Sequence, residues 1–331
     1  MKNFLSWLIK AFISGIIALI LLTGFSAFYY NVPLDTEDES GATDYAWKPH
    51  TFYSRGTEGF SVGKTNNEGY LNTYDYSPDM DINVLVVGSS HMEAYQVAMD
   101  ESTTAVLGQL MPDKNVYNIG ISAHTLMVCS DNLEAAVEKY APSEYVILET
   151  ASLFFTNDQL REAIDGTVSE IPANDGGIVG ALKRNPYIRL IHTQFQNFMS
   201  TDNGGGNSDQ ASEPPLRGDD SLYDELLAKL KATVSKTGAR LIIMYHPSIY
   251  LNEDGSLFVD KDEELTNFFA THCEKNEVEF LDMTQRFIEG YEENLTLPHG
   301  FTNSSVGTGH LNRYGHAMIA EALYDLMKEG E

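Results

Sequence analysis

Two serines and a histidine follow a short apolar run in the stretch NVLVVGSSHMEAY, residues 83–95. The apolar run predicts a buried strand, and the residues after it predict the start of a helix. A serine at the N-terminus of a helix lies near unpaired backbone N–H groups, which favour a developing alkoxide or oxyanion. Serine is also a preferred helix cap. Ser90 is therefore either a nucleophile or a cap, and this stretch alone favours the cap.

A glycine follows a second strand-like run, in the stretch NVYNIGIS. Asn118-Ile119-Gly120 ends that run, and glycine permits a tight turn or a close approach of the backbone. The turn is the simpler interpretation. If Ser90 is a nucleophile, however, the N–H of Gly120 lies on the neighbouring strand end and can join the N–H of Ser90 in an oxyanion hole.

The stretch GFTNSSVGTGHLNRYGHAMIAEAL near the C-terminus contains two histidines. We expect His310 in a glycine-rich loop, Asn312 as the cap of the next helix, and His316 one turn inside that helix. A loop histidine far in sequence from a strand-end serine is typical of an acyl-transfer pair that meets only in space. Histidine is also the side chain that accepts protons near neutral pH. The pattern indicates a general base at His310 and a structural role for His316.

The elements that must position these residues alternate between strand-like and helix-like patterns. Amphipathic segments such as SDNLEAAVEKYA separate five β-branched runs, namely NVLVVG, NVYNIGI, EYVILET, ARLIIMYH and VEFLDM. Continuous apolar runs predict strands that are buried on both faces of a parallel sheet. The alternation predicts a three-layer α/β/α fold with a central parallel sheet of about five strands. In such a fold the functional crevice lies at the carboxyl ends of the strands.

The first thirty residues have a different character. Residues 12–30 carry no charge, and as a helix they are long enough to cross a membrane. Lys2 and Lys10 precede this run and acidic residues follow it, which predicts an N-terminus inside and the rest of the chain outside the cell membrane. A cleaved signal peptide is the alternative. GFSAFYY lacks a clean small-x-small cleavage site, so we favour a single-pass anchor over residues 1–30.

The remaining chain divides into a tether with an irregular lead-in segment, residues 31–80, and a catalytic domain, residues 81–331. Within that domain, residues 153–220 break the alternation with a helical insertion and the low-complexity linker STDNGGGNSDQASEPPLRGDD. The insertion is either a lid over the crevice or a solvent-exposed decoration.

Composition excludes several classes of function. The net charge of −27 argues against nucleic acid as a partner. Cys129 and Cys273 are too few for a disulfide framework, and we expect free buried thiols. The sequence contains no nucleotide-binding motif, and its histidines show no familiar metal-ligand spacing, so we expect no metal and no cofactor. Nothing in the sequence indicates an oligomeric state.

Together these motifs resemble the SGNH (GDSL-like) hydrolase superfamily, in its membrane-tethered bacterial form. Gly88-Ser89-Ser90-His91 resembles the first block, with Ser89 where aspartate is usual. Asn118-Ile119-Gly120 resembles the second block, HLNRYGH (residues 310–316) the last, and TNNEGYLN the lead-in to the nucleophile strand. The blocks occur in family order over residues 60–330. The resemblance implies a flavodoxin-like fold with Ser90 as nucleophile, His310 as base, and the Ser90 and Gly120 amides in the oxyanion hole.

The chain departs from the family pattern at two positions. The acidic partner usually stands three residues before the histidine, where this chain has Gly307. The third block usually supplies an asparagine, but this chain has ILETASLFF, in which Thr150 or Ser152 can donate instead. Glu93 and Glu149 are the carboxylates best placed to replace the acid, although each also has a structural or solvent-exposed interpretation.

We therefore expect a membrane-anchored, extracytoplasmic serine ester hydrolase or O-acyltransferase, with the hydrolase favoured. By family analogy and location, the substrate is an O-acylated carbohydrate or another ester, with O-acetyl groups of surface or cell-wall glycans expected. The alternative is a catalytically weak SGNH scaffold that binds glycans or assists assembly at the membrane. Gly307 and the missing asparagine motivate that alternative.

Overall fold

The computed structural model describes residues 2–31, 47–168, 185, 187–188, 190–191 and 216–329. Its centre is a five-stranded sheet in the order β10-β7-β6-β4-β5, in which every pairing is parallel. The strands are β4 (Val84–Val87), β5 (Val116–Asn118), β6 (Tyr145–Thr150), β7 (Arg240–Tyr245) and β10 (Glu279–Asp282). Counted along the chain, this order is the 2-1-3-4-5 order of flavodoxin-like folds. The predicted fold class is confirmed.

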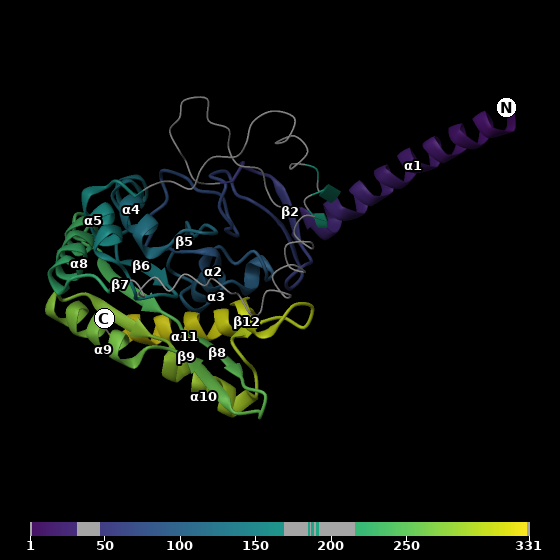
Figure 1. The fold of residues 1–331 in the computed structure, drawn as a ribbon. Coiled ribbons are helices and arrows are strands. Elements are labelled where there is room, and N and C mark those ends of the chain that lie inside the picture. The colour runs from purple at the N-terminus through teal and green to yellow at the C-terminus, as the bar shows by residue number, and fades with distance from the viewer. Residues whose placement is uncertain are drawn as a thin grey trace.

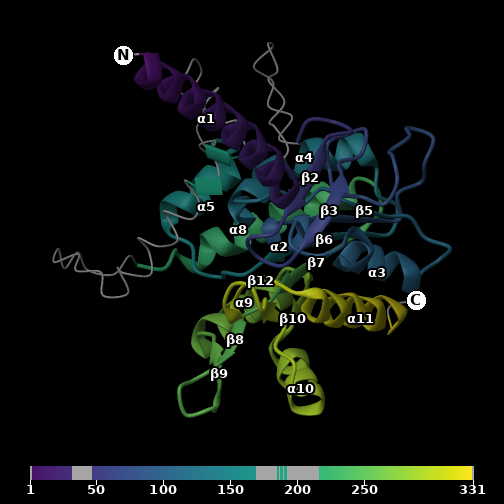
Figure 2. The ribbon, with the colours of Figure 1, turned by 90° about the vertical axis from the view of Figure 1, so that its right-hand side faces the viewer.

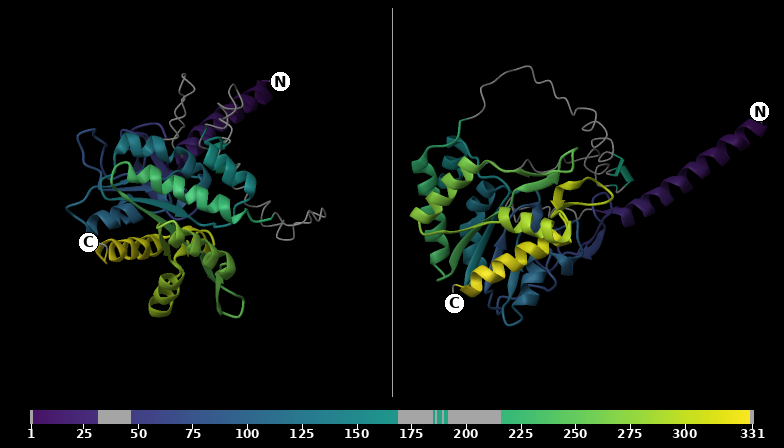
Figure 3. Two further views of the ribbon diagram at one scale, coloured as in Figure 1. Left: turned by 90° about the vertical axis from the view of Figure 1, so that its left-hand side faces the viewer. Right: turned by 90° about the horizontal axis from the view of Figure 1, so that it is seen from below.

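Alternate residues of each strand point to opposite sides of the sheet, so both of its faces are apolar. Helices cover both faces. Leu85 and Leu148 pack with one helical layer, and Val86 and Ile147 pack with the other. The first layer contains α4 (Leu126–Tyr140), α5 (Asn157–Asp165), α8 (Asp220–Ser235) and α9 (Glu263–Lys275). The second layer contains α3 (Thr103–Leu110), α10 (Thr284–Asn294) and α11 (Arg313–Glu329). Figure 2 shows α11 on one side of the sheet and α4 and α8 on the other, and the left panel of Figure 3 gives the opposite view.

Short antiparallel pairs surround the carboxyl edge of the sheet. The lead-in segment contains a hairpin of β2 (Phe52–Arg55) and β3 (Ser61–Lys64), to which β1 (Tyr30–Asn31) is added. Further along the chain, β8 (Ser248–Leu251) pairs with β9 (Leu257–Asp260), and β11 (His299–Gly300) pairs with β12 (Val306–Leu311). Two short helices, α2 (Ser90–Glu93) and η1 (Met99–Glu101), follow β4.

The N-terminal helix α1 (Lys2–Tyr29) projects from the rest of the molecule (Figure 1). Its segment Phe4–Tyr29 has 26 residues and a mean hydropathy of 2.3, so it is long and apolar enough to cross a membrane, and it is exposed except near the end that meets the hairpin, where Ser26 is buried. At 1.5 Å per residue this segment extends about 39 Å, which exceeds a hydrocarbon core of about 30 Å. The chain passes from α1 directly into β1, and the Ser54 hydroxyl of β2 donates to the Ala27 carbonyl over 3.1 Å. The helix is thus joined to the hairpin.

Two predicted segments lie largely outside the described residues. Most of the tether, residues 32–46, is one of them. Of the predicted insertion at 153–220, the structure describes α5 and the start of α8, while residues 169–184 and 192–215 are not described. The two cysteines lie in α4 and α9 as buried free thiols, as expected.

Candidate active site

The two serines after β4 have different roles. Ser89 is the N-cap of α2, and its Oγ accepts the N–H of His91 over 3.3 Å. Ser90 is the first residue of α2, and its Oγ lies 2.9 Å from the Nε2 of His310. The helix cap is therefore Ser89, and Ser90, its neighbour, stays the candidate nucleophile.

His310 reaches Ser90 from the end of the β11–β12 pair. The predicted glycine-rich loop is a short strand in the structure, because β12 pairs with β11 through Leu311 and His299. Asn312 follows that strand and caps α11, since its Oδ1 accepts the N–H groups of Tyr314 and Gly315 over 2.9 and 3.2 Å. The strand and the capped helix together determine the direction of the imidazole.

The other nitrogen of the imidazole contacts Glu58, a residue that the sequence analysis did not single out. The Nδ1 of His310 lies 2.7 Å from the Oε2 of Glu58, and the backbone N–H of His310 donates to Oε1 over 2.9 Å. Burial alone would raise the pKa of the Glu58 carboxyl, but the hydrogen bonds and charge of His310, together with nearby Arg55, lower it below its ordinary value. Ser90, His310 and ionised Glu58 form the serine–histidine–acid arrangement used in acyl transfer.

Glu58 is held in the turn between β2 and β3. The Oδ1 of Asn303 accepts the N–H of Gly59 over 2.9 Å, and its Nδ2 donates to the carbonyls of Gly56 and Gly59 over 3.0 and 2.8 Å. Gly309, next to the histidine, has a φ of +86°, and a Cβ there would lie 2.5 Å from the Oε1 of Glu58. Glycine at this position therefore makes room for the carboxylate.

Sequence reasoning missed Glu58 because the family pattern directs attention to position 307. Gly307 has a φ of +87°, and a Cβ there would lie 2.9 Å from atoms of both Leu297 and Tyr250, so an acidic side chain does not fit. The available signal was RGTEGF, which places one carboxylate in a glycine-flanked turn.

Glu93 does not serve as the acid partner that the sequence suggested. Its fully buried carboxylate accepts hydrogen bonds from the Trp47 indole and from the hydroxyl and N–H of Ser122, the last over 3.1 Å. Burial raises the pKa of Glu93, and these hydrogen bonds only partly oppose that shift. The side chain joins the lead-in segment to the loop after β5, away from the imidazole of His310.

Glu149, the other suggested acid, also bonds elsewhere. Its Oε2 accepts the N–H of Ser89 over 2.6 Å, and its Oε1 lies 2.8 Å from the Nε2 of His246. A Cβ at position 88 would lie 2.6 Å from the same carboxylate, which explains the glycine there. Glu149 supports the turn that presents the serines and does not contact His310.

The candidate oxyanion donors are not equally available. The N–H of Ser90 lies in the first turn of α2, where backbone N–H groups have no partner within the helix. The N–H of Gly120 instead donates to the Oδ1 of Asn118 over 2.8 Å, which argues against the expectation that it joins the oxyanion hole. A Cβ at Gly120 would lie 2.7 Å from the Glu93 nitrogen, so the glycine permits close packing against α2.

The two proposed substitutes for the missing asparagine bond to each other. The Thr150 hydroxyl donates to the Ser152 carbonyl over 2.6 Å, and the Ser152 N–H donates back to the Thr150 hydroxyl oxygen over 3.2 Å. These bonds close a turn after β6. The expectation that Thr150 or Ser152 donates to an oxyanion is therefore not supported by their positions.

His316 has the structural position that the sequence predicted. Its Nδ1 accepts the N–H of Thr103 over 3.2 Å and lies 2.9 Å from the Thr103 hydroxyl, which joins α11 to α3. Burial, with smaller effects of neighbouring histidines, lowers the pKa of His316 to about 3. The ring is therefore neutral at pH 7.

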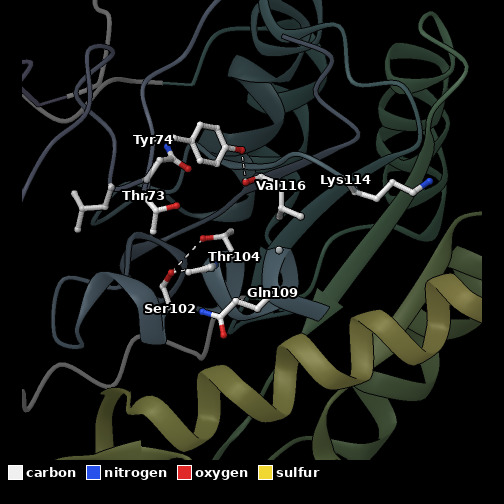
Figure 4. A pocket seen from close by; sticks show the side chains of 11 residues that line it. Thr73, Tyr74, Ser102, Thr104, Gln109, Lys114 and Val116 are labelled. Atoms are coloured by element: carbon white, nitrogen blue, oxygen red, sulfur yellow. Dashed lines mark hydrogen bonds between the residues drawn. The ribbon is translucent and has the colours of Figure 1, made fainter. Parts of the chain in front are cut away.

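The candidate triad is partly exposed at the molecular surface. The side chains of His310 and Glu58 are 26% and 15% exposed. A separate pocket of about 230 Å³ lies beside β5 and α3 (Figure 4), and no triad residue lines it. Its polar lining includes Tyr74, Ser102, Thr104, Gln109 and Lys114.

A group of three histidines lies next to the triad and has the residue types to hold a metal ion. His91, His246 and His299 each offer one nitrogen, and these nitrogens lie within 4.8 Å of one another. The ring of His91 lies 5.4 Å from that of His310, measured between centroids.

No protein-family model matches the chain, and no curated protein matches it. Solved structures with a similar fold include an acetyl xylan esterase, AlAXEase, at 12% identity and a TM-score of 0.42, covering 73% of this chain and 98% of that chain. A lipolytic protein of the G-D-S-L family from Veillonella parvula has 11% identity and a TM-score of 0.40, covering 74% and 97%. The psychrotrophic esterase EstA from Pseudoalteromonas sp. has 17% identity and a TM-score of 0.38, covering 75% and 98%.

Proposed function

We propose that this chain is a serine ester hydrolase or O-acyltransferase of the SGNH (GDSL-like) type, with hydrolysis favoured. The observation that carries this proposal is the continuous chain of contacts from Ser90 through His310 to Glu58, at 2.9 and 2.7 Å. A binding scaffold has no need to direct an imidazole and a partly buried carboxylate at a partly exposed serine. The complete triad therefore favours the enzyme.

The proposed reaction begins when the Oγ of Ser90 attacks the ester carbonyl carbon while the Nε2 of His310 takes the hydroxyl proton. Glu58 accepts the Nδ1–H of His310 and stabilises the imidazolium. The N–H of Ser90 donates to the carbonyl oxygen as it becomes an oxyanion. Collapse of the tetrahedral intermediate expels the alcohol, which takes the proton from Nε2, and leaves the acyl group on Ser90.

The acyl group then leaves by the reverse sequence of proton transfers. Water or a sugar hydroxyl gives its proton to His310 and attacks the acyl carbonyl, which releases Ser90 as a free hydroxyl. Water yields a carboxylic acid, and a sugar hydroxyl yields a new ester. The two activities differ only in the acceptor.

We further propose that the enzyme acts outside the cell membrane on O-acetyl groups of surface or cell-wall glycans. The exposed apolar surface of α1 supports a single-pass anchor, and Lys2 and Lys10 support an N-terminus inside. The partly exposed triad suits a polymeric substrate, because a glycan chain can lie across an open surface while a short acyl group enters the site.

The test uses the full chain in detergent with p-nitrophenyl acetate, alongside Ser90→Ala and His310→Ala. We expect turnover and fluorophosphonate labelling of the wild type, and loss of both in Ser90→Ala. Turnover that persists in Ser90→Ala would contradict the nucleophile. An O-acetylated oligosaccharide, with products identified by mass spectrometry, then separates released acetate from acetate transferred to an acceptor sugar.

One observation favours the second candidate, a weak scaffold that binds glycans. The N–H of Gly120 is already bonded to Asn118, which leaves the oxyanion hole with fewer donors than the family pattern implies. Glycan binding by the wild type without turnover or labelling would support this candidate.

A further inference from the structure

Three imidazoles from distant parts of the sequence meet beside the candidate triad. His91 is the second residue of α2, His246 directly follows β7, and His299 begins β11. The ring centroids lie 4.6 Å apart for His91 and His246, 5.6 Å for His246 and His299, and 5.9 Å for His91 and His299. His246 and His299 are each 1% exposed, while His91 is partly exposed and leaves a route from solvent.

One ring nitrogen of His246 is hydrogen-bonded, and the other has no hydrogen bond among the described residues. Its Nε2 donates to the buried carboxylate of Glu149 over 2.8 Å, which leaves the lone pair on Nδ1. That Nδ1 has no hydrogen-bond partner among the described residues. In most histidine metal ligands, one ring nitrogen donates its N–H to a carboxylate while the lone pair of the other nitrogen binds the metal. Double protonation of His246 would instead bury an N–H without an acceptor.

His299 is buried without any hydrogen bond to the described part of the chain, at either Nδ1 or Nε2. A neutral imidazole carries one donor and one acceptor, and buried polar atoms are nearly always paired. The ring therefore has a lone pair that accepts no hydrogen bond from the described residues. Neutral imidazole is the form that binds metals.

His91 also presents a lone pair. Its Nδ1 accepts the N–H of Leu311 over a long 3.4 Å, so this nitrogen is unprotonated. A metal bound at this nitrogen would replace one long hydrogen bond.

We propose that His91, His246 and His299 bind one transition-metal dication, Zn²⁺ foremost, and leave a fourth position open. Three nitrogen ligands suit zinc, whereas calcium and magnesium take oxygen ligands. Tetrahedral Zn–N bonds of about 2.0–2.1 Å place ligand nitrogens about 3.3 Å apart. The present separations, within 4.8 Å, therefore need to shorten by at most about 1.5 Å. Glu149 supplies a negative charge next to three neutral ligands.

The proposed metal joins the segments that carry the triad without entering the ester chemistry. His91 follows Ser90 in the chain, and His299 pairs with Leu311, the residue after His310. A metal on these rings would limit the relative movement of the two segments. The proposal does not depend on the chain being an esterase.

The test uses the full chain in detergent, stripped of metal with a chelator, and follows Zn²⁺ binding by calorimetry. We expect one equivalent of zinc on the wild type and loss of that binding in His299→Ala. Glu149→Gln keeps all three ligands but weakens the support of His246, so we expect about 10- to 100-fold lower zinc affinity. His50→Ala, at a surface histidine with a 49% exposed side chain, is the control and keeps the equivalent.

Co²⁺ on the wild type provides a readout that does not depend on the folding of any variant. We expect the strong visible absorption of four-coordinate cobalt, which Zn²⁺ displaces at one equivalent. A wild type that binds neither ion at this stoichiometry overturns the proposal. Zinc bound with equal affinity by folded His299→Ala and by the wild type also overturns it.

Discussion

Glu58 lies 2.7 Å from the Nδ1 of His310, although 252 positions separate them in the sequence. The acid therefore comes from the N-terminal hairpin and not from the segment before the histidine. The same hairpin packs against the end of α1, where a Cβ at Gly56 would lie 2.7 Å from the Tyr29 carbonyl oxygen. The helix end, the turn and the carboxylate form one continuous unit, so the position of the acid depends on the segment that leads out of α1.

Replacing Glu58 by glutamine tests its role directly. The amide keeps the size of the side chain but cannot balance an imidazolium, and it no longer favours the productive tautomer of His310. We expect kcat to fall by about 10²- to 10⁴-fold with a smaller change in KM. Steady-state kinetics on p-nitrophenyl acetate measure this effect, with Glu253→Gln on the exposed surface as the matched control. Equal loss in both variants would argue against Glu58 as the acid.

Much of the fold could be predicted from the sequence, because strands buried on both faces leave uninterrupted apolar runs. Ser90 and His310 could be singled out as candidates because each follows or ends an element with a recognisable pattern. Glu58 could not, since a carboxylate in a turn is common and only the tertiary structure brings it to His310. The histidines show no familiar metal-ligand spacing in the sequence, because the proximity of His91, His246 and His299 depends on β4, β7 and β11 meeting at one edge.

Asn303 should act as a positioning residue through the turn that carries Glu58. Asn303→Asp keeps the acceptor for the Gly59 N–H but loses the donor to the carbonyls of Gly56 and Gly59. We expect a loss of about 1–3 kcal/mol in the stability of the turn and a decrease in kcat of about 10-fold or more. Hydrogen exchange over residues 52–64 measures the loosening. Unchanged hydrogen exchange together with a reduced kcat would contradict the prediction that Asn303 acts through this turn.

Ser89→Ala separates the cap from the nucleophile. The variant loses the side-chain acceptor of the His91 N–H but keeps the Ser89 N–H donor to Glu149. We expect a decrease of about 1 kcal/mol in the free energy of unfolding, typical of a lost cap, while fluorophosphonate labelling of Ser90 persists. Denaturant unfolding and labelling are measured on the same sample. Complete loss of labelling in a folded Ser89→Ala protein would contradict the assignment of Ser89 as the cap and Ser90 as the nucleophile.

Stability should decrease in acid partly through His316. The folded ring has a pKa of about 3, whereas an unfolded histidine titrates near 6.5. Between these values the unfolded state binds the extra proton, so the free energy of unfolding falls by about 1.4 kcal/mol for each unit of decreasing pH. His316→Gln should be less stable at pH 7, because it loses contacts with Thr103, yet its stability should fall less steeply down to pH 4. Metal-free denaturant unfolding measures the slopes, with His50→Gln as a control that should run parallel to the wild type.

A comparison of Gly309 with Gly238, which has the same backbone conformation, tests the contact between Gly309 and Glu58 separately from the cost of that conformation. Gly309 and Gly238 have φ values of +86° and +85°, and an alanine in this region costs about 1–2 kcal/mol at either site. Nothing lies within 4 Å of a Cβ at Gly238, whereas a Cβ at Gly309 would lie 2.5 Å from the Oε1 of Glu58. Both alanine variants should therefore lose similar stability, but only Gly309→Ala should displace the carboxylate and lose kcat toward the level of Glu58→Gln. Thermal melting and steady-state kinetics on the two proteins give the comparison. Equal kcat in the two alanine variants would mean that Glu58 keeps its hydrogen bond to His310 despite the added methyl group. Glycine at position 309 would then be needed only for its backbone conformation.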